Sequence, residues 1–239
     1  MSVWTLLGRT PSGVRGFRMD GAQLLEEVAA SESGASLALL AKDGPVVRIG
    51  DGGAEALPVA VLPGDGTSLS NLEQESPPDV ISGWVRLWVA GALASKPNWA
   101  GVIVVTHGDV THWLQISADE VVSVQSVITQ RLLTALGGAD RLDASALADS
   151  MSQPERLAAH LRKADVTGDA AAATGHLMGV ELAATRPYWL GQEVIVISEV
   201  PGLHMQALEH QAVPCTAYHP QDLLAAGLAA LAQSLGYVD

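Results

Sequence analysis

The chain of 239 residues has little cysteine, few basic residues and no long hydrophobic run. Its single cysteine, Cys215, excludes an internal disulfide and any metal site built from several cysteines. Thirteen lysine and arginine residues stand against 26 acidic ones, and this imbalance repels nucleic acid and anionic lipid. The apolar run at 223–232 is too short for a membrane span, and residues 1–13 have no signal-peptide pattern. We therefore expect a cytoplasmic protein with no nucleic-acid or membrane partner.

The first third of the chain has the pattern of short strands. With 48% hydrophobic and 16% charged residues, the composition is that of a globular protein. Residues 64–78 are polar and rich in turn formers, and they are predicted to be a linker. The predicted strands before it are 2–10, 13–21, 45–50 and 57–63, with a short helix at 36–41.

After the linker the pattern becomes regular. Short connections join three strand-like runs, which predicts an antiparallel meander. Helices, a strand, a helix, a strand and a last helix follow, and this order is typical of a ribonuclease H-like unit. The expected elements are a helix at 79–95, the meander at 101–107, 110–117 and 120–128, helices at 154–164 and 171–189, and strands 193–198 and 213–219, each followed by a helix, at 201–212 and 220–235.

The opening hairpin of residues 1–63 could be part of a reduced copy of the same unit. The predicted fold class is therefore α/β, an actin-like ATPase arrangement of two ribonuclease H-like units of which the N-terminal one is reduced. The predicted domains are 1–63, the linker 64–78, and 79–239.

The turn between the first two strands of the meander is the first candidate site. It places Asp109, Thr111 and two histidines, His107 and His112, around Gly108. One interpretation is a solvated turn, since Gly-Asp turns are common in hairpins. Another is an anion or sugar-acid site formed by the Gly108 and Asp109 amides with Thr111 and His112. A metal site would need a ligand beyond the two histidines and Asp109.

Four runs resemble one family of sugar-acid kinases. They are ESPPDV at 75–80, GVIVVTHGDVTHWLQISADEVVSVQSVIT at 101–129, PERLAA at 154–159 and GHLMGVELAATRPYWLGQEV at 175–194. In this order they resemble 2-dehydro-3-deoxygalactonokinases, which belong to the actin-like ATPase class. The resemblance begins near Leu57 and reaches the C-terminus. It implies a sugar-acid substrate, with ATP and magnesium as cofactors if the kinase activity survives.

The charged positions of the family's first two motifs differ here. The family's D-W-G-T-[ST]-x-x-R hairpin aligns with residues 8–15, where Gly8 replaces the aspartate and Arg15 remains. The helix start D-V-x-R-G-E-E-[ST] aligns with residues 79–86. Asp79 remains there, but both glutamates are gone and Trp84 replaces the first of them.

The other two motifs change in charge as well. The phosphate-contacting turn G-T-H-[ST]-K-W aligns with residues 108–113, where Asp109 replaces a small hydroxyl residue and His112 replaces the lysine. Thr111 keeps its hydroxyl. The motif T-G-E-L aligns with residues 129–132, and Arg131 replaces its glutamate.

Phosphoryl transfer depends on acids that hold the metal and on donors that contact the phosphates. Because four motifs lose charged groups of these kinds, we interpret the chain as a degenerate kinase that keeps the fold and a binding or assembly role. The alternative is an active ATP-dependent kinase of 2-dehydro-3-deoxygalactonate, with Asp79, Asp109 and Glu181 as its acids. The partners implied are a sugar acid or nucleotide, and a second copy of the chain. Residual anion contacts are predicted at Arg15, Gly108, Asp109, Thr111 and His112.

Two further features have two interpretations each. Gly175 and Gly179 lie on a helix that packs near the nucleotide in the family, but small residues also permit close helix packing. Trp84 and Trp88 share one face of the predicted 79–95 helix. We expect that face to be covered by the N-terminal unit or by a second copy in a two-fold dimer, and Trp84 either fills the former cleft or contacts a partner.

Overall fold

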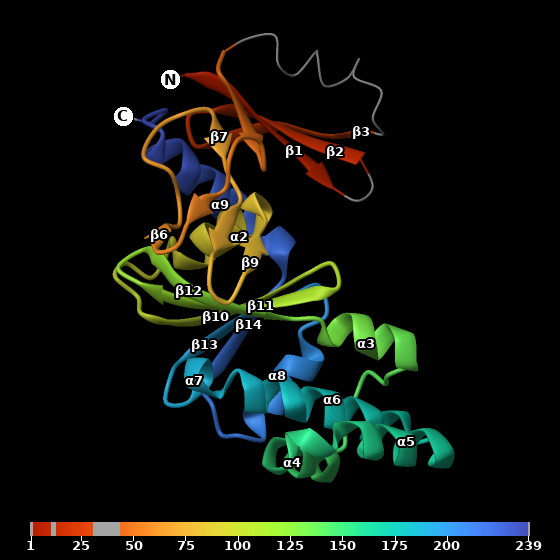
Figure 1. Cartoon of the computed structure of the whole chain (residues 1–239). Coiled ribbons are helices and arrows are strands. Elements are labelled where there is room, and N and C mark those ends of the chain that lie inside the picture. The colour runs from red at the N-terminus through yellow and green to blue at the C-terminus, as the bar shows by residue number, and fades with distance from the viewer. Residues whose placement is uncertain (1, 11–12, 31–43, 239) are drawn as a thin grey trace. The chain divides into compact units, whose positions relative to one another are not determined.

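The computed structural model describes residues 2–10, 13–30 and 44–238 (Figure 1). They form two compact units: unit 1 is Met1–Trp99, Ser117–Val122 and Gln221–Asp239, and unit 2 is Ala100–Ile116 and Ser123–Pro220. This division differs from the predicted one, because the boundary falls after Trp99 and residues 64–78 carry two strands in place of a linker. The helix predicted at 36–41 lies outside the described residues.

Unit 1 contains a five-stranded sheet in the order β3-β2-β1-β4-β7. The first three strands are antiparallel neighbours, and β4 and β7 continue the sheet in parallel. The third strand, QLLEEVAA, was not predicted, because its leucine, glutamate and alanine residues favour helix; pairing with β2 overrides that preference. The strands are β1 (Val3–Thr10), β2 (Gly13–Asp20), β3 (Gln23–Ala30), β4 (Val46–Ile49) and β7 (Ser68–Leu69).

A buried arginine, Arg86, holds the irregular segment around residues 55–70 in place. The side chain of Arg86 is 1% exposed, and it forms an ion pair with Glu55 at 2.7 Å. It also donates to the carbonyls of Val61 at 2.8 Å and Ser70 at 2.9 Å. Around it, β5 (Glu55–Ala56), β8 (Leu72–Gln74) and β9 (Asp79–Ile81) form a small sheet, and β6 (Val59–Ala60) pairs with the first residues of β12.

Among the described residues of unit 1, the helices are α2 (Gly83–Leu93) and α9 (Pro220–Ser234). They approach closely at two glycines. A Cβ at Gly91 would lie 2.3 Å from the carbonyl oxygen of Leu223, and one at Gly227 would lie 2.3 Å from that of Leu87. Any larger residue at either position would force the helices apart.

Unit 2 repeats the strand order of unit 1. Its sheet runs β12-β11-β10-β13-β14, again third, second, first, fourth and fifth strand, with β13 and β14 parallel to β10. The strands predicted here are confirmed, and β13 and residues 102–105 of β10 are apolar because both of their faces are buried. The strands are β10 (Gly101–His107), β11 (Val110–Ser117), β12 (Glu120–Val127), β13 (Val194–Ile197) and β14 (Cys215–Tyr218).

Helices cover this sheet, and Figure 1 shows α4, α5 and α6 together on one side of it. Both units thus have the strand order of the ribonuclease H-like fold, and the chain has the predicted α/β, actin-like ATPase class of architecture. Two helices, α3 and α4, were not predicted individually. The helices are α3 (Thr129–Leu136), α4 (Ala144–Ser152), the 3-10 turn η1 (Pro154–Arg156), α5 (Leu157–Thr167), α6 (Ala170–Ala184), α7 (Arg186–Trp189) and α8 (Gly202–Glu209).

Candidate functional site

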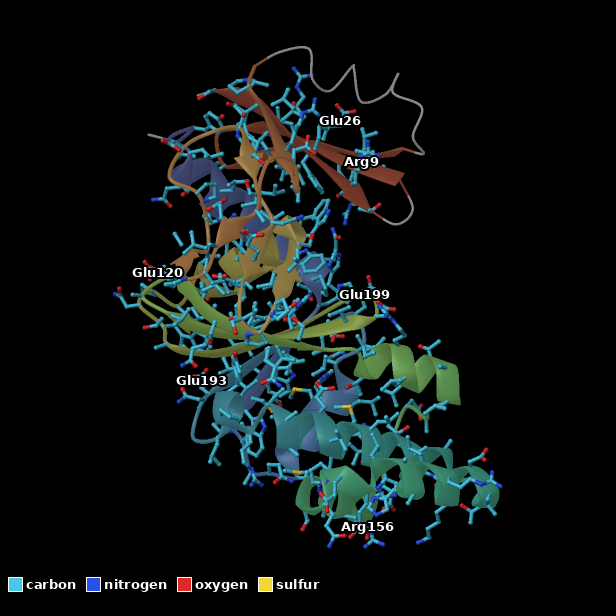
Figure 2. All side chains as sticks on the ribbon, viewed as in Figure 1. Arg9, Glu26, Glu120, Arg156, Glu193 and Glu199 are labelled. Carbon is cyan, nitrogen blue, oxygen red and sulfur yellow. The ribbon has the colours of Figure 1, made fainter. Side chains whose placement is uncertain are left out.

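The candidate site lies in unit 2 at the carboxyl edge of the parallel strands. Because β10, β13 and β14 are parallel, their last residues meet at one edge, where ligands bind in open α/β sheets. The β10–β11 turn and the start of α3 adjoin this edge, since β10 and β12 end there. In Figure 2, Glu193 and Glu199 mark the two ends of β13, and Glu199 lies at the candidate edge.

The turn between β10 and β11 is fixed to α3 by an ion pair. Gly108 adopts a left-handed φ of 63°, which turns the chain sharply. Arg131 Nε lies 2.5 Å from Asp109 Oδ2, and the second contact, from NH2 to Oδ1, is 3.1 Å. The Arg131 hydrogen bond, aided by its charge, lowers the pKa of Asp109, and the same pairing raises the pKa of Arg131. The carboxylate is therefore already neutralised by a neighbour.

Thr111 and His112 do not converge with Asp109. Successive strand residues face opposite sides of a sheet, and each of these two side chains is buried with a partner of its own. The Thr111 and Thr106 hydroxyl oxygens are 3.5 Å apart, and His112 Nδ1 lies 2.6 Å from Ser126 Oγ. The predicted joint anion site of these side chains is therefore not assembled here.

A metal site at the turn is not supported either. Burial lowers the pKa of His107, so this histidine is neutral over a wider pH range. Within residues 2–10, 13–30 and 44–238, however, no three histidine, cysteine or acidic side chains come close enough together to hold a metal ion. The solvated-turn interpretation fits the geometry best.

Glu181, the third candidate acid, lies at the centre of a buried network. Its side chain is 0% exposed, and its Oε1 accepts hydrogen bonds from Trp113 Nε1 and His204 Nε2, each at 2.9 Å. Burial alone would raise the pKa of Glu181. The charge of His204 and hydrogen bonds from His204, Thr129 and Trp113 outweigh that effect and lower it.

The hydrogen bonds from Trp113 and His204 to Glu181 join three elements of unit 2, namely β11, α6 and α8. An ionised carboxylate without exposed surface cannot contact a substrate that arrives from solvent. In this structure the burial and hydrogen bonds of Glu181 favour a structural role, in which it holds the elements beside the candidate edge in place.

The two glycines of α6 serve helix packing. A Cβ at Gly175 would lie 2.4 Å from the Asp143 carbonyl oxygen, and one at Gly179 would lie 2.4 Å from that of Leu147. The backbone of α4 fills the space beside both glycines. This geometry favours the interpretation that the two glycines permit close helix packing.

The candidate residues of unit 1, Arg15 and Asp79, also have bonding partners already. Arg15 forms an ion pair with Glu27, and its NH2 lies 3.1 Å from Gln221 Oε1. Its guanidinium lies over the ring of Phe17, 5.3 Å from the centroid. The Oδ1 of Asp79, at the start of β9, accepts a hydrogen bond from the Val80 amide at 2.9 Å. An anion that bound Arg15 would have to displace Glu27 and Gln221 from its guanidinium group.

Gly8, at the position of the family's first aspartate, lies under an indole ring. A Cβ on this residue would lie 2.5 Å from Trp84 Cζ2. The Trp84 ring is held there because its Nε1 donates to the Arg9 carbonyl at 2.6 Å, and the residue is 5% exposed. Trp84 therefore fills the core of unit 1, and the expectation that the N-terminal unit covers this tryptophan is confirmed.

The sequence reasoning missed a histidine pair and a key partner of Glu181. In unit 2, His160 and His176 stack with ring centroids 4.4 Å apart. Both Nδ1 atoms contact Ser150 Oγ, at 3.1 Å and 2.9 Å. Neither these histidines nor His204 stands in a recognisable spacing, so no sequence signal could have found them.

Comparison with one solved structure supports the fold. A candidate 2-dehydro-3-deoxygalactonokinase from Sinorhizobium meliloti matches with a TM-score of 0.76 and 19% sequence identity, over 96% of this chain and 98% of that one. The activator of the 2-hydroxyisocaproyl-CoA dehydratase from Clostridium difficile, with ADPNP bound, matches with a TM-score of 0.49 and 13% identity, over 96% and 94% of the two chains.

Sequence comparisons gave no match. No family model matches the chain, and no curated protein matches it. Among the residues that the structure describes, no helix is long and apolar enough to cross a membrane.

Proposed function

We propose that the chain is a sugar-acid-kinase-like protein that has lost phosphoryl transfer and keeps a binding or assembly role, in the cytoplasm. The observation that carries this proposal is the contact of Trp84 with Gly8. An aspartate cannot occupy position 8 while the indole lies 2.5 Å from the place of its Cβ. The two substitutions therefore replace a metal-holding acid with apolar packing.

The ion pair at the β10–β11 turn supports the same conclusion. In the resembled family, position 131 carries an acid and position 109 a small hydroxyl residue. Here Arg131 and Asp109 form a bidentate ion pair. Each of the two substituted residues therefore neutralises the charge of the other. A phosphate that approached this turn would find Arg131 already paired with Asp109, so the arginine charge is not available to bind it.

The remaining candidate acids offer no substitute. Glu181 is sealed inside unit 2, and Asp79 belongs to unit 1 with a carboxylate oxygen on its own strand. A kinase needs acids that reach the metal and the attacking hydroxyl. We therefore take a sugar acid or a nucleotide as a bound ligand and not as a reacting one, with ATP and magnesium unused as cofactors.

A phosphotransfer assay tests this proposal. The full chain is incubated with ATP, magnesium and 2-dehydro-3-deoxygalactonate, and we expect no sugar phosphate above the buffer control. Turnover at roughly 1–100 per second would contradict the proposal. The matched controls are Asp79→Asn and Asp109→Asn: activity that both variants retain comes from a contaminating kinase, whereas activity that either one abolishes belongs to this chain.

Calorimetry and light scattering separate binding from assembly. A heat of binding with ATP or the sugar acid, without turnover, supports the binding role. A mass of two chains with no heat from either ligand supports assembly as a homodimer. A monomer that binds neither ligand would contradict both roles.

A further inference from the structure

A cavity of unit 2 lies at the far end of α3 from the candidate site. It encloses about 530 Å³ and is lined by residues from the end of α3, from α5 and from the start of α6. Small-molecule sites in proteins enclose roughly 300–1,000 Å³. Arg131, which contacts the β10–β11 turn, is in the first turn of α3, whereas Leu136 and Gly137 at its other end line this cavity. The cavity is therefore separate from the hairpin turn.

The walls of this cavity are mainly hydrocarbon. Leu161, Ala164 and Ala173 line it together with Leu136, which is 52% exposed. A leucine side chain that faces water at a concave surface favours a ligand with an apolar body, because contact removes both surfaces from water.

Two helices end at the cavity, and both ends carry partial negative charge. Gly137 and Gly168 are the C-caps of α3 and α5, with left-handed φ angles of 66° and 67°. Capping amides satisfy some of the last carbonyl groups: the Leu133 carbonyl accepts from the Gly138 amide at 2.8 Å and the Ala164 carbonyl from the Asp169 amide at 2.9 Å. The negative end of each helix dipole still favours a cation at this position. Both cap glycines are lining residues of the cavity.

The positive groups at the cavity are already neutralised. Arg162 NH1 lies 2.5 Å from Asp165 Oδ2. The N-terminus of α6, which would attract an anion, is capped by Asp169, whose Oδ1 accepts from the Ala172 amide at 3.0 Å. Each positive group thus has its own carboxylate, and the two helix C-termini leave the cavity with a net negative potential.

We propose that this cavity binds a small amphiphilic cation, a hydrocarbon chain that ends in an ammonium group. The chain packs against Leu136, Leu161 and Ala173. The ammonium group lies among the carbonyl ends of α3 and α5, where it also meets the carboxylates of Asp165 and Asp169.

Three ligands with the same hydrocarbon chain test the proposal. The full chain, labelled with ¹⁵N, is titrated with hexylammonium, hexanoate and hexanol, and amide shifts are followed by NMR. We expect hexylammonium to shift the amides of Gly137, Gly168 and Ala173 and to bind at least tenfold more tightly than hexanoate. Equal or tighter binding of hexanoate would overturn the charge assignment, as would equal binding of hexanol. No shift at these amides with any of the three would overturn the site.

Two variants locate the binding. Ala173→Leu fills the cavity and is expected to weaken hexylammonium binding at least tenfold. Leu136→Ser, at an exposed position that tolerates substitution, is expected to weaken it several-fold, and it serves as the test if the first variant does not fold. The control is Val200→Ala, at a residue that is 73% exposed and does not line the cavity; it should bind like the native chain. Unchanged binding in a folded Ala173→Leu protein, or in Leu136→Ser, would contradict the proposal.

Discussion

The indole ring of Trp84 occupies the place that a side chain on Gly8 would need. Trp84 Cζ2 lies 2.5 Å from the position of a Cβ on Gly8, and Ile49 Cβ lies 3.1 Å from it on the other side. Phe17 packs edge-on against the same indole, with ring centroids 6.1 Å apart. Because the ring is enclosed on these sides, neither residue can change size without a cost to the other.

Gly8→Ala is expected to destabilise the protein by about 1–3 kcal/mol, since it overpacks a filled core. Trp84→Ala is expected to cost about 3–5 kcal/mol because it leaves a cavity. In the double variant the methyl group enters that cavity, so the combined loss should fall short of the sum by 1 kcal/mol or more, a coupling typical of residues in contact. Urea denaturation of the four proteins measures each value.

Gly53→Ala is the matched control for this cycle. A Cβ at Gly53 meets no atom within 4 Å, so the substitution should change the free energy of unfolding by no more than about 0.5 kcal/mol. Strictly additive losses at Gly8 and Trp84 would contradict the fit inferred for the pair.

The sequence predicted the architecture well where periodicity and short connections decide it. The meander at 101–107, 110–117 and 120–128 follows from two tight turns, and the apolar run at 193–198 could only be a buried strand. Residues 23–30 were missed because their helix propensity is overridden by pairing with β2.

The site could be predicted only in part. Arg131 and Asp109 differ in charge from the residues at these positions in the resembled family. Their pairing could not be predicted, because it depends on α3 following β12 at the edge where the β10–β11 turn lies. Glu181 resembled a catalytic acid in the sequence. Its burial depends on His204 and Trp113, which are 23 and 68 residues away along the chain. No local pattern encodes contacts over such separations.

Glu181→Gln tests the buried network. The amide keeps the shape of the side chain but loses the charge that Trp113 and His204 contact, and we expect a loss of about 1–3 kcal/mol at pH 7. Because the folded pKa of Glu181 is lowered, the stability it contributes is present above the pKa of a free glutamate, about 4.3. That stability is lost as pH falls through the folded pKa.

The difference between native and Glu181→Gln proteins should therefore shrink below about pH 4.3. Chemical denaturation at several pH values measures it. Glu199→Gln is the control, since Glu199 is exposed at the sheet edge and should change stability little. A difference that stays constant down to the lowest pH would show that folding does not change the pKa of Glu181, and it would contradict the lowered value.

Arg131→Gln should raise the pKa of Asp109 toward that of a free aspartate. The Arg131 hydrogen bond is the main cause of the lowered value, and its charge adds to it. NMR titration of the side-chain carboxyl carbons measures the pKa directly. Arg162→Gln removes an ion pair with Asp165 elsewhere in unit 2 and should leave Asp109 unchanged. An unaltered pKa in Arg131→Gln would mean that the ion pair does not persist in solution.

Because His160 and His176 stack between α5 and α6, we predict that acid destabilises the packing of α4, α5 and α6. Burial lowers the pKa of His176, and the charge of His160 lowers it further. The Ala146 carbonyl and Asp149 oppose these effects, and the charge of Lys163 makes the smallest contribution, which also lowers the pKa. An unfolded histidine takes up a proton near about pH 6.5, whereas folded His176 stays neutral to lower pH. The unfolded state therefore binds more protons in this window, and stability should fall as pH drops from about 6.5 toward the folded pKa.

His160→Gln separates the two contributions to this acid sensitivity. The glutamine can still accept a hydrogen bond from Ser150, but it removes the positive charge that lies against His176. We expect the pKa of His176 to rise, although burial keeps it below the value of a free histidine. The loss of stability below about pH 6.5 should become smaller. Proton NMR titration of the imidazole measures the first effect and urea denaturation the second, with His210→Gln, at an exposed position, as the control. An unchanged His176 pKa in His160→Gln would contradict the electrostatic coupling of the pair and leave burial and the charge of Lys163 as the causes of the lowered pKa.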